Sequence, residues 1–254
     1  MLTVSRLSIT PVRSLALSHP LSIELGPGGV ADDRRYLILG VDDRLLDGTK
    51  HGPLARMRAE LAHDPERLTL TLPDGVVVGG EVALGAPRQI EVYRRRFAVR
   101  PVIGPWADAI AATIGRPVEL VRAERAAGTR DRHAVSILSE ASVAELERQA
   151  NDGRPLDPRR FRMLVQFAGG AAHQEDGWIG REVRIGAAVV RVTKPDPRCV
   201  ITTQDPDTGE RDFPTLHAIR GYRGLRDGKH IDFGVYADVV TPGTVRVGDR
   251  VEPR

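Results

Sequence analysis

One cysteine in this sequence stands among residues that would control its chemistry. Cys199 lies in the run 194–210, after two prolines and directly next to Arg198. Proline fixes φ and favours extended backbone in the residue before it, so we expect the chain to reach the thiol extended and without helix. We expect a short buried strand to follow at Val200 and Ile201. Arg198 and Lys194 would favour the thiolate, which is the nucleophile and a ligand for soft transition metals.

The same cysteine has a plainer interpretation. A lone cysteine is more often a small buried hydrophobe than a reactive group. Because it is the only cysteine, an internal disulfide, a cysteine-rich zinc site and an iron–sulfur cluster held by four thiolates are excluded. A redox reaction at this site would therefore need electrons from another protein.

Composition places the chain among folded globular proteins. Its 254 residues suffice for one large or two small domains, with 28% charged and 41% hydrophobic residues. No apolar run reaches the roughly 18 residues of a membrane helix, so we expect a cytoplasmic protein with no signal, no membrane anchor and, in the simplest case, a monomer. Net charge is only +3. The one dense basic run, 93–97, is better explained as a solvated strand edge than as a nucleic-acid site.

Hydrophobic patterning predicts a β-rich first part. Strands are expected at 2–9 and 36–39, in a hairpin over 67–78, and at 82–84 and 90–93. The pattern changes at Trp106, where apolar residues follow helical spacing to Ile114 and Gly115 ends the element. This change predicts two domains, 1–103 and 104–254.

The second part mixes strands with short helices. A buried strand ending near Leu138 is expected to run into a helix, with Ser139 at its start and Ser142 and Glu145 forming a capping box. Further strands are expected at 160–167, in a hairpin over 183–192 and in a last hairpin over 233–251, with a short helix at 214–223. The overall fold class is mainly β with a few helices (α+β).

Three segments offer groups that bind anions. Arg13 and Ser14 follow a strand-breaking proline, and Arg34 and Arg35 stand at the mouth of the buried strand 36–39. Arginine pairs phosphate through two parallel hydrogen bonds, and a serine at a helix N-terminus adds free backbone amides. Taken singly, these signals are also explained by a surface turn, by solvated charges and by an ordinary helix cap.

Together these segments resemble the MOSC family, named after the C-terminal domain of molybdenum cofactor sulfurases. The resemblance rests on 132–146, 160–162, 175–180, 194–210 and 233–249, with looser matches near the N-terminus. Its best-known members are the mitochondrial amidoxime-reducing component and bacterial reductases of N-hydroxylated bases. Membership implies a MOSC β-barrel fold preceded by a MOSC N-terminal β-barrel domain. It also implies a molybdenum cofactor, a molybdopterin whose metal is bound by the sulfur of Cys199; pyridoxal phosphate is not expected.

The resemblance also assigns roles to individual residues. Cys199 would be the metal ligand and a catalytic residue, and Asp176 would be either a nearby catalytic acid or a turn residue. The residues implied to contact the cofactor are Arg13, Ser14, Arg34, Arg35, Ser139, Arg160, Phe161, Arg162, Arg198 and Thr202. Met163 and Leu164 stand where the family has Pro-Asn. This departure removes a hydrogen-bonding group and predicts a more apolar site with bulkier or less polar substrates.

The expected function is that of a molybdenum-cofactor-dependent oxidoreductase. It would reduce small N-oxygenated compounds with electrons from an external flavin or iron–sulfur protein, without nucleic-acid or membrane partners. Two alternatives stay open: a sulfur carrier or sulfurtransferase with a persulfide on Cys199, and a module that only binds the cofactor.

Overall fold

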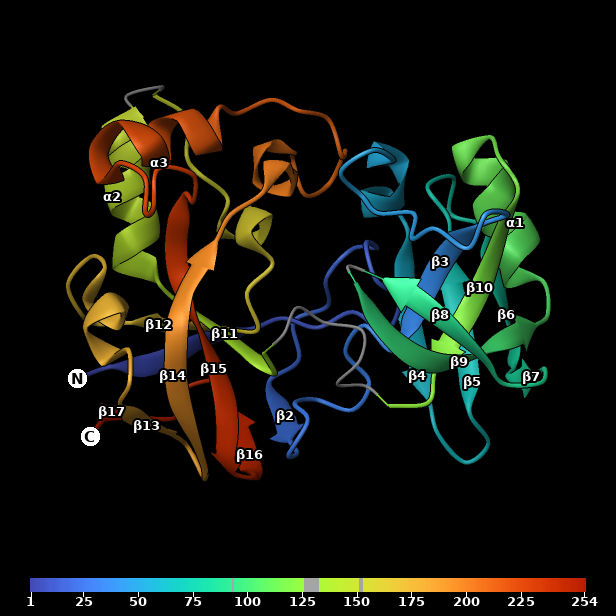
Figure 1. Ribbon diagram of the computed structural model, residues 1–254, viewed down its shortest axis with the longest axis horizontal. Coiled ribbons are helices and arrows are strands. Elements are labelled where there is room, and N and C mark those ends of the chain that lie inside the picture. Colours follow the sequence, from blue (N-terminus) through green and yellow to red (C-terminus); the bar gives the residue numbers. More distant parts are fainter. Residues whose placement is uncertain (93, 126–132, 151–152) are drawn as a thin grey trace.

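A seven-stranded sheet forms the larger lobe of the molecule (Figure 1). The computed structural model describes residues 1–92, 94–125, 133–150 and 153–254. The order of the sheet is β1-β12-β11-β15-β14-β13-β17. These strands span Thr3–Leu7, Val165–Ala168, Val135–Ser139, Asp232–Thr241, Ala188–Pro197, Glu182–Ile185 and Val251–Pro253.

Backbone hydrogen bonds join the two edges of this sheet. Val4 donates its amide to the Asp249 carbonyl at 2.8 Å, and Val251 donates to Leu2 at 3.0 Å. The sheet thereby curls into a nearly closed barrel filled by alternating apolar side chains, among them Val4, Ile137 and Val235. We call this part the barrel lobe.

Two helices cover one face of the barrel lobe. Helix α2 (Glu140–Ala150) follows β11, and α3 (Thr215–Arg223) packs beside it. Their buried side chains, Leu146 and Ile219, share a small core with Phe161 and Phe233, whose rings stack at 4.6 Å. The expected helix at 214–223 is confirmed.

A second lobe is built from residues 36–123. One sheet contains β3 (Tyr36–Gly40), β10 (Val118–Ala123), β9 (Arg95–Ile103), β7 (Ala83–Leu84) and β8 (Arg88–Val92). The other contains β4 (Arg58–Ala62), β5 (Arg67–Thr71) and β6 (Val77–Glu81). The strand expected at 36–39 is fully buried, and the hairpin over 67–78 is formed. Tyr93 lies outside the described residues. We call this part the 36–123 lobe.

Helix α1 (Trp106–Ile114) belongs to the 36–123 lobe. It ends at Gly115, whose φ of 73° suits glycine, and Trp106 donates its indole N–H to the Leu68 carbonyl at 3.0 Å. The helix expected from the periodicity is confirmed. Strand β10, which follows residue 103 in the sequence, pairs with β3 and β9 and so belongs to the 36–123 lobe. The division into 1–103 and 104–254 stays a prediction, and moving it past 123 would keep β10 with its partners.

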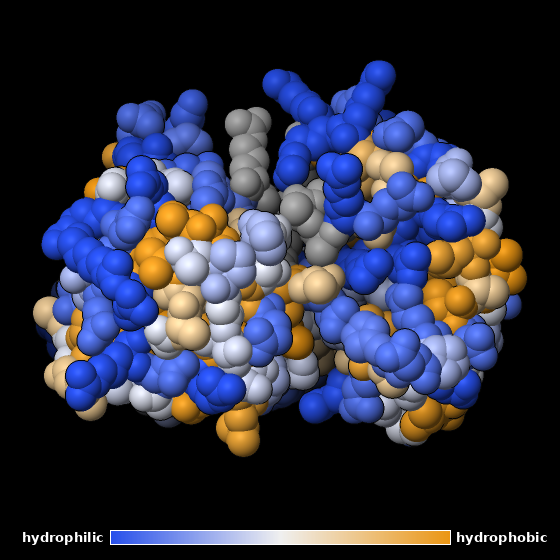
Figure 2. Space-filling view, turned by 90° about the horizontal axis from the view of Figure 1, so that it is seen from below, coloured by the Kyte–Doolittle hydropathy of each residue, from blue (hydrophilic) through white to orange (hydrophobic). Residues whose placement is uncertain are grey.

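The expected class, mainly β with a few helices, is confirmed. No helix among the described residues is long and apolar enough to span a bilayer. Figure 2 shows hydrophilic side chains over both lobes on one face, with hydrophobic residues gathered in separate patches.

Several local predictions are wrong. Residues 158–161 form a 3-10 helix, and Arg162 then adopts φ of 52°, so a strand begins only at Val165. Val200–Thr203 is a 3-10 helix instead of a buried strand. The final hairpin does not form, because β16 (Gly243–Arg246) pairs with β2 (Ser22–Leu25).

The start of α2 is capped differently from the prediction. The Ser139 Oγ accepts the amide of Ser142 at 3.0 Å, so Ser139 caps the helix. Ser142 lies inside the first turn, and its own hydroxyl donates to Glu175 at 2.9 Å. The sequence spacing of Ser142 and Glu145 therefore does not form a capping box, since a serine one turn earlier takes that place.

Candidate functional site

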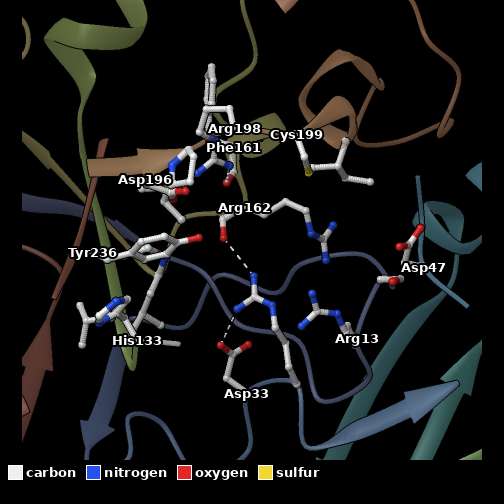
Figure 3. Close-up of a pocket in the computed structure, with 18 of the residues that line it drawn as sticks. Arg13, Asp33, Asp47, His133, Phe161, Arg162, Asp196, Arg198, Cys199 and Tyr236 are labelled. Carbon is white, nitrogen blue, oxygen red and sulfur yellow. Dashed lines mark hydrogen bonds and ion pairs between the residues drawn. The ribbon is translucent and has the colours of Figure 1, made fainter. Parts of the chain in front are cut away.

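A cavity of about 540 Å³ lies where the two lobes meet (Figure 3). Its walls come from the barrel lobe, from the 36–123 lobe through residues 47–49 and Arg95, and from the chain that connects β1 to β3 through Arg13 and Arg34. This volume lies within the roughly 300–1,000 Å³ of small-molecule and cofactor sites. Six cationic side chains line it against three carboxylates: Arg13, Arg34, Arg95, Arg162, Lys194 and Arg198, with Asp33, Asp47 and Asp196.

The thiol of Cys199 lies on the cavity wall (Figure 3). Strand β14 runs through both prolines to Pro197, and Cys199 keeps extended backbone with φ of −117°. The expectation of an extended approach is thus confirmed. The Cys199 carbonyl accepts the Thr202 amide at 3.2 Å and the Thr202 hydroxyl at 3.1 Å, which fixes the turn after the thiol. Cys199 is exposed, so the interpretation as a buried hydrophobe is wrong.

Arg198 holds the cysteine loop against its neighbour. Its guanidinium is almost fully buried, forms an ion pair with buried Asp196 and donates to the Phe161 carbonyl. It also contacts the Met163 sulfur at 3.3 Å and lies over the Phe161 ring. Arg198 therefore ties the Cys199 loop to the backbone just before Arg162. A role in orienting the loop fits these contacts better than direct contact with a phosphate.

Three arginines, which we call the arginine cluster, form another part of the wall: Arg13, Arg34 and Arg162. In Figure 3 the guanidinium groups of Arg13 and Arg162 point into the space below the Cys199 sulfur. Arg34 pairs with fully buried Asp33 at 2.6 Å and donates to the Arg162 carbonyl at 3.0 Å. Arg162 donates to the Leu15 carbonyl at 2.7 Å. The contacts of Arg34 thus fix the backbone that presents Arg162.

The arginine cluster is electrostatically suited to an anion. Burial, followed by the charges of Arg34 and Arg13, lowers the pKa of Arg162 to about 9, against an opposing effect of Asp33. Like charges held together are costly, and a bound phosphate would relieve that cost. The residues present thus fit the phosphate of a molybdopterin, and the exposed thiol beside them fits its metal.

Backbone strain also marks the arginine cluster. Ser14, Arg34 and Arg162 adopt φ of 78°, 57° and 52°, a region that residues with side chains seldom occupy. Such conformations cost about 1–3 kcal/mol each and concentrate at ligand sites, where the fold imposes them. All three residues line the cavity.

A different wall of the cavity carries Lys194, Tyr236 and His133. Lys194 on β14 pairs in register with Tyr236 on β15, and its Nζ lies 5.6 Å from the centre of the Tyr236 ring. His133 stacks on the same ring at 5.3 Å, and its Nδ1 lies 3.1 Å from an Asp238 carboxylate oxygen. Sequence reasoning assigned no site role to His133 or Tyr236. Tyr236 comes beside Lys194 only through the pairing of β14 with β15, which neither segment reveals alone.

Met163 and Leu164 also line the cavity, and each is only 2% exposed. The two residues that replace Pro-Asn therefore bring apolar groups to the wall. The expectation of a more apolar site than in the rest of the family stays a prediction.

Several predicted site residues do not line the cavity. Arg160 turns away and forms two hydrogen bonds with Asp212 at 2.6 and 2.8 Å. Thr202 is buried and acts through the Cys199 carbonyl. Arg35 lies at the mouth of β3 but is absent from the cavity wall.

Ser139 and Asp176 lie away from the cavity as well. Ser139 caps α2, and its amide donates to buried Glu175 at 3.2 Å, whose pKa is raised by burial. Asp176 accepts a hydrogen bond from Arg223 at 2.6 Å. Asp176 therefore joins η4 (Gln174–Trp178) to α3, and these contacts favour the turn interpretation over a catalytic acid. Phe161, by contrast, lines the cavity.

Among the residues that the structure describes, no group of three or more His, Cys, Asp or Glu side chains is arranged to hold a metal ion.

Comparison with known proteins identifies relatives. A family model described as MOSC domain matches residues 124–252. Mitochondrial amidoxime-reducing component 1 of Mus musculus is 37% identical over an alignment of 124 residues, and the match covers 45% of this chain and 35% of that protein. Molybdenum cofactor sulfurase of Caenorhabditis briggsae is 27% identical over an alignment of 245 residues, and the match covers 92% of this chain and 33% of that protein. The chain thus spans about a third of the length of these relatives.

Among solved structures, the YuaD protein of Bacillus subtilis aligns over 100% of this chain and 96% of its own, with 12% identity and a TM-score of 0.49. The family expected from the sequence motifs is confirmed by the family model.

Proposed function

Because this chain belongs to the MOSC family, we propose that it holds a molybdenum cofactor in the cavity between its lobes and reduces N-oxygenated compounds. The observation that carries the proposal is the exposed Cys199 thiol, which lies on the same cavity wall as the arginine cluster. Relatives named amidoxime-reducing components support this reaction class.

Different residues of the cavity would bind the metal and the phosphate of the cofactor. The Cys199 thiolate would ligate the metal, and Arg13 and Arg162 would hold the terminal phosphate through charge-assisted hydrogen bonds. Arg34 would hold the backbone of Arg162 in place through its hydrogen bond to the Arg162 carbonyl. Arg198 would hold the Cys199 loop in place through its hydrogen bond to the Phe161 carbonyl. Once bound, the cofactor would supply the redox-active metal at which an N–O bond is cleaved.

The proposed reduction needs a source of electrons and protons. Cleaving an N–OH bond to N–H and water consumes two electrons and two protons. With a single cysteine the chain has no four-thiolate iron–sulfur cluster of its own. An external flavin or iron–sulfur protein would therefore deliver the electrons.

A direct test compares the wild type with Cys199→Ser, both purified from a host that makes the cofactor. We expect the wild type to contain molybdenum by mass spectrometry and to reduce benzamidoxime with a reduced viologen dye as donor. The serine variant should lose both, at least about tenfold, because an alcohol is a poor ligand for a soft metal. A wild type that stays metal-free and refuses added cofactor would refute the proposal.

A second candidate function is that of a sulfur carrier. The relative that matches 92% of this chain is a molybdenum cofactor sulfurase, and an exposed thiol is also suited to carry sulfur. A sulfur carrier predicts that Cys199, without molybdenum, accepts the outer sulfur of an added donor persulfide, which leaves as a thiol, and so becomes a persulfide itself. Persulfide-specific labelling of metal-free wild type, with Cys199→Ser as control, separates this function from the reductase.

A further inference from the structure

Lys194 places an ammonium group on the cavity wall, and no described carboxylate pairs with it. It lines the cavity and lies over the Tyr236 ring. Within residues 1–92, 94–125, 133–150 and 153–254, its Nζ has no hydrogen bond and no ion pair. A lysine that faces a cavity in this way can bind an anionic group of a ligand.

The carboxylates of the cavity are positioned beside other cations. Asp33 pairs with Arg34, and Asp196 pairs with Arg198. Asp47 lies on the Arg13 side of the cavity, across from Tyr236 (Figure 3). Lys194 therefore adds positive charge on the Tyr236 side, apart from the arginine cluster that we assign to the phosphate.

Tyr236 and His133 fix the place of Lys194 on this part of the wall. The Lys194 ammonium and the His133 ring both contact the Tyr236 ring, and Asp238 orients His133 through Nδ1. A ligand that enters the cavity beside Tyr236 would bring an anionic substituent within reach of the lysine.

We propose that Lys194 is a specificity-determining residue that binds a carboxylate of the substrate. The preferred substrates would then be N-oxygenated compounds that carry a negative charge, such as a carboxy-substituted aryl amidoxime. This proposal rests on the proposed function for the N-oxygenated part of the substrate. The carboxylate subsite itself is a property of the protein and can be tested without turnover.

The lysine content of the chain allows a direct binding test. The sequence has three lysines, Lys50, Lys194 and Lys229. Reductive ¹³C-methylation keeps their positive charge and gives one NMR signal for each lysine and one for the N-terminus. Lys194→Met and Lys229→Met assign two of these signals by their disappearance. Metal-free protein is then titrated with 4-carboxybenzamidoxime and, separately, with uncharged benzamidoxime.

We expect the Lys194 signal to shift with the carboxylate ligand and the Lys229 signal to stay unchanged. Unmethylated wild type should bind the carboxylate ligand about tenfold more tightly than the uncharged one in calorimetry, which is the scale of one charge-assisted contact. Lys194→Met should lose that preference, whereas Lys194→Arg and the matched control Lys229→Met should retain it.

Three outcomes would overturn the proposal. In the first, the wild type binds both ligands with equal affinity. In the second, Lys194→Met keeps the preference for the carboxylate ligand. In the third, Lys194→Met keeps this preference but loses bound molybdenum cofactor. The last result would assign Lys194 to the cofactor instead. If the charge preference is present but no N-oxygenated compound is reduced by the molybdenum-loaded protein, the subsite stands and the proposed reaction fails.

Discussion

Two groups of arginines meet at residues 159–162 and differ in how their charge is balanced. Arg159 and Arg160 belong to what we call the ion-pair shell, in which they pair with Asp157, Asp207 and Asp212. Arg162, two residues after Arg160, belongs to the arginine cluster. Among the described residues its guanidinium hydrogen-bonds to one carbonyl and to no carboxylate. Arginines only two positions apart in the sequence can therefore have different roles.

The difference separates Arg159 and Arg160, which pair with carboxylates, from Arg162, which hydrogen-bonds to the Leu15 carbonyl. In the ion-pair shell, charges are neutralised within the protein and connect the 3-10 helix at 158–161 to the loop 205–212. In the arginine cluster, burial of Arg162 and then the nearby charges of Arg34 and Arg13 lower the pKa of Arg162. We therefore expect substitutions in the shell to change stability and substitutions in the cluster to change anion binding.

The largest effect on stability is expected from Gly209→Ala, in the loop 205–212 that the ion-pair shell connects to the 3-10 helix at 158–161. A Cβ at Gly209 would lie 1.9 Å from the Gly52 carbonyl oxygen of the 36–123 lobe, and φ there is 75°. Backbone must shift on both sides, which we expect to lower the free energy of unfolding by about 2–4 kcal/mol in urea titration. Gly228→Ala is the matched control, because φ there is 68° and nothing lies within 4 Å. Equal losses in the two variants would show that the contact between lobes is unimportant.

A smaller loss is expected from Arg160→Met. The Arg160 side chain is only 5% exposed, while Asp212 is 34% exposed and can be partly rehydrated once its partner is lost. We expect a loss of about 2 kcal/mol in the free energy of unfolding, with phosphate binding unchanged. Arg148→Met removes a solvent-exposed pair with Glu145 and should change stability little. Weaker phosphate binding in Arg160→Met would instead place this residue in the arginine cluster.

Arg162→Met should show the opposite pattern, with reduced anion binding and little loss of stability. Affinity for inorganic phosphate, measured by calorimetry, should fall about tenfold, since one charge-assisted contact is removed. Arg160→Met is the comparison variant. Retained phosphate affinity in Arg162→Met would show that Arg162 is not part of the anion site.

The same variant gives a test by pH. The folded protein lowers the pKa of Arg162 to about 9, so above this pH the unfolded chain retains a proton that the folded chain has released. Unfolding then takes up a proton, and the stability of the wild type gains from rising pH through this group. We expect the stability of the wild type relative to Arg162→Met to increase between pH 8 and pH 10. A constant difference across this range would contradict the lowered pKa.

How far sequence predicts this molecule depends on the range of the interactions involved. The helix at Trp106–Ile114 and the extended approach to Cys199 follow from local periodicity and from proline, and both are formed. Strand alternation fails at Arg160 and Arg162, because Arg162 takes a left-handed conformation held by Arg34, 128 residues away. The wall of Lys194 and Tyr236 arises from pairing between two strands, which neither segment shows alone.

The smallest expected effect concerns Ser14, the strained residue that follows Arg13 of the arginine cluster. Its φ of 78° disfavours any residue with a Cβ, so Ser14→Gly should be more stable than Ser14→Ala by about 1 kcal/mol, read from urea unfolding. Both variants lack the hydroxyl, so their difference isolates backbone strain. Gly75→Ala provides the reference cost of a Cβ at positive φ, because φ at Gly75 is 87° and no atom lies near its Cβ position.

If the Ser14 hydroxyl binds phosphate, both Ser14 variants should weaken phosphate binding equally. If only Ser14→Gly weakens it, the strained backbone matters because it holds Arg13 in place, and the side chain of Ser14 does not take part in binding.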